Sequence, residues 1–185
     1  MMKVAFGILI VCILFLTASR FSYAVNQSLV ISTPTPSIDY TLPYPGLLPS
    51  HPLYFMKNLR DRILLAMTRD PLKKSEYLLL FSDKLLAMGK VLLKDKKKEL
   101  AGETLIKGER YLLSSLDRLS ESKGRGIFPP GYIQKIGLSA KKHQEVITNL
   151  IFQVSDPASL DKLKEALLIN SKASVKASQL GVPQK

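Results

Sequence analysis

Apolar side chains between residues 133 and 154 repeat with a spacing that alternates between three and four positions. This period places them on one face of a helix, because an α-helix completes a turn in about 3.6 residues. The face consists of Ile133, Ile136, Ala140, His143, Ile147, Leu150 and Val154. Such a regular pattern predicts a helix near residues 131–154 that packs against its neighbours along a continuous seam, as in a coiled coil.

Similar patterns predict four more helices. Asp70-Pro71 and Asp156-Pro157 each combine an N-cap residue with a proline at the first helical position, and they start helices near 71–94 and 157–179. A helix near 98–121 is expected to return antiparallel to the one before it. The first helix, near 53–68, has an apolar face at Met56, Leu59, Ile63 and Met67. We therefore expect an all-α fold: a bundle of about five helices built from antiparallel hairpins, in one domain over residues 42–181.

The residues before this domain indicate export. Residues 1–24 contain an apolar run from Val4 to Leu16 and end in Ser22-Tyr23-Ala24, the small-x-small pattern of a signal-peptidase site. They predict a signal peptide; the alternative is a short membrane anchor over residues 4–19. Residues 25–41 are rich in Ser, Thr and Pro and predict an extended linker. The protein is thus expected outside the cell or in the cell envelope, and removal of residues 1–24 would also remove the single cysteine, Cys12.

A proline-rich segment, residues 42–54, joins the linker to the first helix, and we call it the clasp. It contains Pro43, Tyr44, Pro45, Gly46, Pro49, Pro52, Leu53 and Tyr54. Its prolines exclude a helix or an inner strand, while its leucines and tyrosines are too apolar for a simple spacer. We expect Leu47, Leu48, Leu53 and Tyr54 to be buried against the helices near 71–94 and 98–121. With Arg60, Asp61, Arg62, Asp70 and Pro71, the clasp forms a candidate structural motif.

These segments resemble a family known as domain of unknown function 5667, which occurs in exported bacterial proteins. The similarity is carried by Leu42–Pro49, Pro52–Tyr54, Leu59–Ile63, Asp70–Glu76, Asp83-Lys84 and Lys142–Val146. It covers roughly residues 42–150. The resemblance implies export and a helical fold, and it implies no established activity.

His143 is the one side chain in the predicted helices that could act as a ligand or a general base. We interpret it as a seam histidine that is hydrogen-bonded to a carboxylate or carbonyl group across the bundle. The alternative is a bundle that carries a haem or metal on His143, with Met56, Met67 or Met88 as the second ligand. No Cys-x-x-Cys-His, Glu-x-x-His or His-Glu-x-x-His motif is present, so we expect no cofactor and no metal.

The acidic and basic residues do not indicate catalysis. Asp61, Glu76, Glu103 and Glu109 alternate with lysines and are expected on solvated helix faces, so no catalytic residue is predicted and the chain is not expected to be an enzyme. The net charge is +12, which favours acidic partners. Lys94, Lys96, Lys97 and Lys98 form a candidate patch for an anionic partner, although a purely solubilising role is the alternative.

The Arg60-Asp61-Arg62 group is expected either to bind such a partner or to join the first two helices through an ion pair. These observations favour an exported, envelope-associated helical protein that acts non-catalytically as a structural or binding module. Its expected partner is an acidic envelope polymer, a membrane surface or another envelope protein. Nucleic acid is not expected, because export separates the two and aromatic residues do not alternate with the basic ones.

Overall fold

The computed structural model describes residues 37–181. The predicted signal peptide or anchor, Cys12 and most of the predicted linker lie outside these residues. The described part contains α2 (Tyr54–Met67), α3 (Pro71–Lys94), α4 (Lys98–Gly124), α5 (Tyr132–Ile151) and α6 (Pro157–Gly181). Over this range the chain forms five helices and no strand, which confirms the all-α prediction. None of these helices combines the length and the apolar character needed to span a bilayer.

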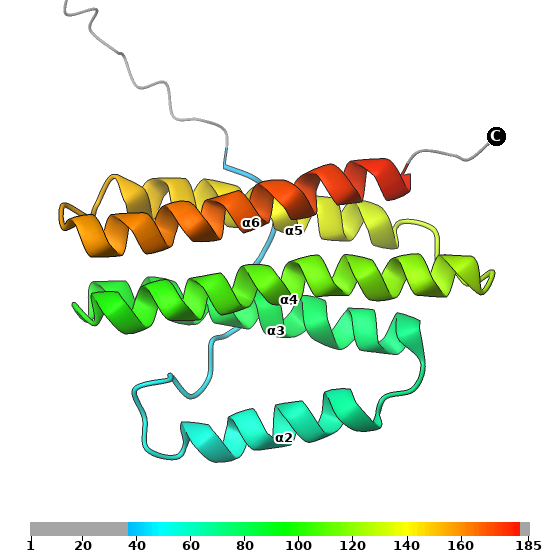
Figure 1. Ribbon diagram of the computed structural model, residues 1–185, viewed down its shortest axis with the longest axis horizontal. Helices are drawn as coiled ribbons and strands as arrows, with labels where there is room; N and C mark the ends of the chain where they lie inside the picture. Colours follow the sequence, from blue (N-terminus) through cyan, green and yellow to red (C-terminus); the bar gives the residue numbers. More distant parts are fainter. Residues whose placement is uncertain (1–36, 182–185) are drawn as a thin grey trace, which may run out of the picture. The chain divides into compact units, whose positions relative to one another are not determined.

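Four of the helices, α3 to α6, form a bundle (Figure 1). The antiparallel pairs are α3 with α4 and α5 with α6, as expected for two hairpins. The pairs are joined mainly where α4 packs beside α6, and α3 also contacts α5. Helices α4 and α6 run in the same direction. Since α4 packs beside α3 and α6, and α5 also packs beside α6, α4 and α5 lie diagonally across the bundle. The loop at residues 125–131 connects these two helices.

Two apolar clusters fill the bundle, one toward each end. The first contains Leu79, Leu112, Leu116, Leu119, Ile133, Ile136, Ala140, Ala173 and Ala177. The second contains Leu86, Leu105, Ile106, Val146, Ile147, Leu150, Val154, Leu163 and Ala166. In each of the four helices, the residues of one cluster are separated from those of the other by a buried polar side chain. The two clusters therefore enclose a polar layer.

Both predicted Asp-Pro helix starts are present. Asp70 Oδ1 accepts a hydrogen bond of 2.9 Å from the backbone N–H of Leu72, and Asp156 Oδ2 accepts one of 3.0 Å from that of Ser159. These bonds satisfy backbone donors that have no partner within the first turn of a helix.

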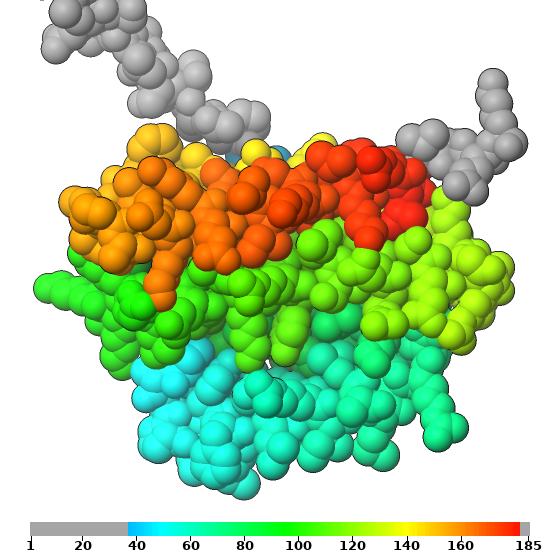
Figure 2. Space-filling view, viewed as in Figure 1, coloured from blue at the N-terminus to red at the C-terminus, as the bar shows by residue number. Residues whose placement is uncertain are grey.

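The apolar face of α2 points away from the bundle, contrary to what its amphipathic pattern suggests for a bundle helix. Phe55, Met56, Leu59, Ile63 and Met67 are between 49% and 76% exposed. We call these five residues the α2 face. Only Asp61 of this helix is buried. In the views of Figures 1 and 2, α2 forms an outer layer below α3 and α4.

The prediction that the clasp leucines are buried is wrong for two of them. Leu47 is 41% exposed and Leu53 is 52% exposed, while Leu48 and Tyr54 are half-buried. The physical reason is that α2 turns its polar side to α3 and α4, so the clasp that leads into it has little apolar surface to cover. The contacts that attach this part of the chain to the bundle lie at residues 38–42, at and just before the start of the clasp. The backbone N–H of Ile38 bonds Glu145, the Tyr40 hydroxyl bonds Asp83, and Leu42 packs on the second apolar cluster.

Gly108 in α4 marks a close approach of two helices. A Cβ atom at this position would lie 3.2 Å from Leu85 Cβ and 3.5 Å from the carbonyl oxygen of Ser82 in α3. Leu85 Cβ and the Ser82 carbonyl are close to or part of the backbone of α3, so they cannot rotate away as the end of a long side chain can. The glycine lets α3 and α4 pack tightly.

We predict that Gly108→Leu lowers the free energy of unfolding by about 2 kcal/mol or more, because overpacking outweighs the better helix propensity of leucine. Gly137→Leu in α5 is the matched control, since a Cβ there meets nothing within 4 Å. It should leave the protein equally stable or more stable. Urea unfolding of both variants measures the difference, and equal midpoints would contradict the close approach.

Candidate functional site

The polar layer of the bundle contains one residue from each of its four helices. These are Asp83 from α3, Glu109 from α4, His143 from α5 and Asn170 from α6. Each is at most 4% exposed. Each also occupies a position on its helix where the apolar pattern would place a core residue. Because these positions lie at the same height in the bundle, the four polar side chains form one layer.

His143 lies at the centre of this layer and contacts both carboxylates. Its Nδ1 is 2.6 Å from Glu109 Oε1, and its Nε2 is 3.0 Å from Asp83 Oδ1. The remaining carboxylate oxygens also accept hydrogen bonds. Tyr40 Oη donates to Asp83 Oδ2 over 2.6 Å, and Asn170 Nδ2 donates to Glu109 Oε2 over 2.9 Å. The Ser139 hydroxyl donates a further bond of 2.6 Å to Asp83 Oδ1.

This geometry holds the imidazole in its protonated form. Ionised carboxylates only accept hydrogen bonds, so both ring nitrogens must donate, and only imidazolium can do this. Complete burial by itself lowers the pKa of His143. The charges and hydrogen bonds of Glu109 and Asp83 outweigh that effect and raise the pKa to about 9. His143 thus carries a positive charge at neutral pH and compensates two buried negative charges.

The layer is closed on one side by Tyr40, which lies just before the clasp. Burial, followed by the hydrogen bond to Asp83, raises the pKa of Tyr40 above its ordinary value, so this hydroxyl remains a donor. A hollow of about 540 Å³ lies beside it, with Tyr40, Asp83, Tyr132 and Lys135 in its wall. The Asp83 oxygens are already occupied by Tyr40, Ser139 and His143 and do not offer the hollow a vacant acceptor.

The arrangement around His143 is suited to structure rather than to ligand binding. Both nitrogens are engaged, so neither has a lone pair for a metal or for removing a proton from a substrate. Among residues 37–181, no group of three or more His, Cys, Asp or Glu side chains has the geometry of a metal site. Met56 and Met67, two of the methionines considered as haem partners, are exposed on the α2 face, whereas His143 is completely buried.

Two acidic residues that the sequence placed on solvated faces are in fact buried. Glu109 is completely buried, and Asp61 is 8% exposed. Charge alternation suggested exposure, but their positions relative to the apolar residues of their own helices decide which way they point. Asp83 is surrounded in sequence by Leu79, Leu85 and Leu86, and Asn170 follows the stripe of Leu163 and Leu167. A polar residue within such an apolar stripe could have indicated that Asp83 and Asn170 are buried in the layer.

The structure separates the candidate basic groups. Lys94, Lys96 and Lys97 are exposed where α3 turns into α4, whereas Lys98 forms an ion pair of 2.6 Å with Asp156. Asp61 pairs with Lys57 at 3.2 Å and with Arg60 at 2.7 Å, both within α2. Asp61 therefore does not form the ion pair that was expected between the first two helices. A side-chain hydrogen bond of 2.9 Å from Lys107 Nζ of α4 to Asn58 Oδ1 links α2 to the bundle.

Arginines border the α2 face on both sides. With about 100° of rotation per residue, Arg62 falls on the edge next to Phe55, and Arg60 falls on the opposite edge next to Met67. Beside this face lies an open hollow of about 590 Å³. Its wall combines apolar side chains with three cations and is formed by Pro45, Gly46, Leu47, Leu53, Met56, Lys57, Arg60 and Lys84.

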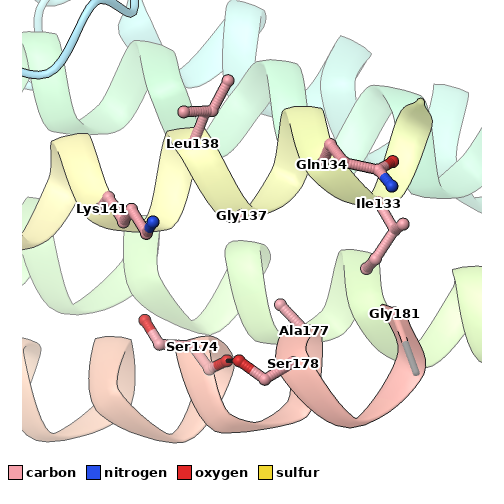
Figure 3. Close-up of a pocket in the computed structure, with 9 residues that line it drawn as sticks. All are labelled: Ile133, Gln134, Gly137, Leu138, Lys141, Ser174, Ala177, Ser178 and Gly181. Carbon is pink, nitrogen blue, oxygen red and sulfur yellow. Dashed lines mark hydrogen bonds between the residues drawn. The ribbon is translucent and has the colours of Figure 1, made fainter.

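A third hollow, of about 460 Å³, lies between α5 and α6 (Figure 3). Small side chains such as Ser174, Ala177 and Ser178 form its floor on α6, and Lys141 is the charged residue in its wall. Ser178 donates its hydroxyl to the Ser174 carbonyl in its own helix. The polar groups of this hollow are therefore few and do not converge on a common point.

The fold and these sites define a small four-helix-bundle protein with a charged layer in its core and an additional amphipathic helix on its outside. The model of the family described as Domain of unknown function (DUF5667) matches residues 46–157, and the chain belongs to this family. The match covers residues 46–54 of the clasp, α2 to α5 and three members of the polar layer. No curated protein and no solved structure matches the chain.

We predict that His143→Gln lowers the free energy of unfolding by about 3 kcal/mol, because it removes the cation that contacts both Asp83 and Glu109. His51→Gln is the matched control, since this second histidine of the chain is exposed. It should change stability by less than about 0.5 kcal/mol. Thermal and urea unfolding measure both, and a loss as small as that of the control would show that the layer is not held by charge.

The pH dependence of stability follows from the same group. The folded-state pKa of His143, about 9, lies above the ordinary value of 6.5. Its contribution is therefore fully present below about pH 6.5 and is lost as the pH rises through 9. We expect wild-type protein to lose about 3 kcal/mol of this contribution from pH 6 to beyond pH 9, since each pKa unit corresponds to about 1.4 kcal/mol. The His143→Gln profile should be flatter; parallel profiles would contradict the assignment.

Proposed function

We propose that this protein is exported, remains associated with the cell envelope and acts there non-catalytically as a binding module, with the α2 face as its binding surface. The observation that carries the proposal is the orientation of α2. A helix with five large exposed apolar residues on one side and a buried aspartate on the other is arranged in the opposite sense to an ordinary bundle helix.

Neither apolar cluster of the bundle contains a residue of α2. Their residues come from α3 to α6 and from the α5–α6 connection, with Leu42, the first residue of the clasp, packed against one cluster. The α2 face therefore does not contribute to the packing of the described residues, although exposing contiguous apolar side chains is unfavourable in water. Coverage by a partner is the physical reason that such a face would be retained.

A binding role also fits the layer around His143. Its five hydrogen bonds satisfy the two carboxylates from within the protein, which supports a rigid scaffold rather than a reaction centre. The export part of the proposal is supported by the signal-like sequence of residues 1–24 and by the net charge of +12, which favours acidic envelope components.

Cysteine labelling in intact cells tests location and coverage together. In a Cys12→Ser background, a single cysteine is introduced at Leu59→Cys in the α2 face or at Leu168→Cys in α6, a control side chain with similar exposure of 59%. We expect a membrane-impermeant maleimide to label the control in intact cells and the α2 position much less. In purified protein both should react at similar rates.

Two results would contradict the proposal. If both positions are labelled only after cell lysis, the protein is not exported. If both are labelled equally in intact cells, the α2 face is not covered by a partner.

A further inference from the structure

We infer that the partner of the α2 face is an anionic lipid surface, on which α2 lies parallel to the membrane plane. This inference rests on the proposed function and specifies the chemistry of its partner. It uses three features of the described residues: the exposed apolar side chains, the cations at the borders of the face, and the hollow beside it.

The apolar side chains suit the boundary between headgroups and acyl chains. Phe55, Met56, Leu59, Ile63 and Met67 extend over the whole of α2 and present a continuous strip. Fourteen residues correspond to a helix of about 21 Å, which is too short to cross the hydrocarbon layer. An amphipathic helix of this kind buries its apolar face only to the depth of the interface.

The charges around the strip fit lipid phosphates. Helix α2 contains Lys57, Arg60 and Arg62 against the single acid Asp61, a net charge of +2. Asp61 pairs with Lys57 and Arg60, whereas Arg62 has no carboxylate partner within residues 37–181. The nearby charges of Arg62 and Lys57 also contribute, after burial, to a lowered pKa of Lys107 beneath the helix. This junction therefore holds excess positive charge that an anionic surface would compensate.

The hollow beside α2 offers room for one lipid headgroup. Lys57, Arg60 and Lys84 supply cations, while Leu47, Leu53 and Met56 supply an adjacent apolar wall. A phosphate and the start of an acyl chain have this same combination of charge and apolar surface. The exposure of Leu47 and Leu53, unexpected for a clasp that packs on a bundle, is accounted for if they contact lipid.

The same charges argue against a second copy of this chain as the partner. Two α2 faces brought together would place Arg60 and Arg62 of one copy near those of the other, and each added chain, which is strongly basic, brings further positive charge. Like charges at a contact oppose association. An anionic bilayer satisfies the apolar strip and the arginines at once.

Tryptophan fluorescence provides the test, because the chain contains no tryptophan of its own. The protein is isolated in its processed form, and each variant is compared with wild type of the same N-terminus, so any contribution of residues 1–24 cancels. Leu59→Trp reports on the α2 face and Leu168→Trp on a similarly exposed position of α6. With phosphatidylglycerol vesicles, we expect a shift of emission to shorter wavelength and quenching by brominated lipid for Leu59→Trp only.

Binding measured by vesicle flotation separates the apolar and the electrostatic contributions. Leu59→Ser/Ile63→Ser should weaken binding at least about tenfold, whereas Leu168→Ser/Val175→Ser on α6 should leave it unchanged. Arg60→Gln/Arg62→Gln should also weaken binding about tenfold. Wild type should bind phosphatidylcholine vesicles weakly and should be released from anionic vesicles at high salt.

Two controls accompany these variants. Lys94→Gln/Lys96→Gln should have little effect on vesicle binding, since these lysines lie at the α3–α4 turn. The substituted α2 side chains are outside the apolar clusters, so unchanged thermal unfolding is expected and checks the fold.

Equal responses of the two tryptophan variants, or equal binding to neutral and anionic vesicles, would overturn the inference. So would self-association lost on Leu59→Ser/Ile63→Ser without vesicle binding, which would identify a second copy as the partner. Protection of Leu59→Cys in cells without vesicle binding would leave the proposed binding role in place and remove only the lipid assignment.

Discussion

The contact of His143 with Asp83 and Glu109 is the interaction on which the rest of the bundle depends. Each of the four bundle helices supplies one member of the polar layer, and the apolar clusters above and below are separated at this level. Sliding one helix by a turn would bury a carboxylate or an imidazolium ion without its partner, at a cost of several kcal/mol. Apolar side chains alone tolerate such shifts much better. The layer therefore fixes the register of α3, α4, α5 and α6, in the way that a single polar position fixes the register of a coiled coil.

The sequence predicted the helices and several of their ends, because these are set by local chemistry: the spacing of apolar side chains and the Asp-Pro starts at Asp70 and Asp156. It also placed His143 on a seam. The partners of His143 could not be predicted, since Glu109 and Asp83 are 34 and 60 residues away along the chain and are brought together only by packing. The orientation of α2 escaped prediction for a related reason. Met56, Leu59, Ile63 and Met67 form the same amphipathic pattern whether the bundle or an external partner covers them.

Residues 38–41, just before the clasp, attach the chain to the polar layer and its surroundings. Tyr40 donates to Asp83, and the backbone of Ile38 donates to Glu145 on α5, so residues 38–40 bind α5 and α3 before the proline-rich clasp begins at Leu42, which packs on the second apolar cluster. The sequence placed this anchoring in the clasp, because its leucines and tyrosines stand out, and assigned residues 25–41 to a linker. The clasp instead carries the chain away from the core and into α2. Its prolines suit that role, since they limit the backbone conformations of a segment with few tertiary contacts.

The bundle and α2 thus differ in how they are stabilised, and this difference makes an exposed apolar face tolerable. The bundle has two apolar clusters and a layer in which both carboxylates and the imidazole are hydrogen-bonded. In contrast, α2 is attached through polar groups such as Asn58 and Lys107 and through its short connections to the clasp and to α3. Local stability follows buried apolar contacts, so α2 belongs to the least protected part of the domain. A helix of this kind can adjust to a partner without disturbing the register that His143 maintains. The free energy gained when its apolar face is covered then adds to binding, because it is not already used in folding.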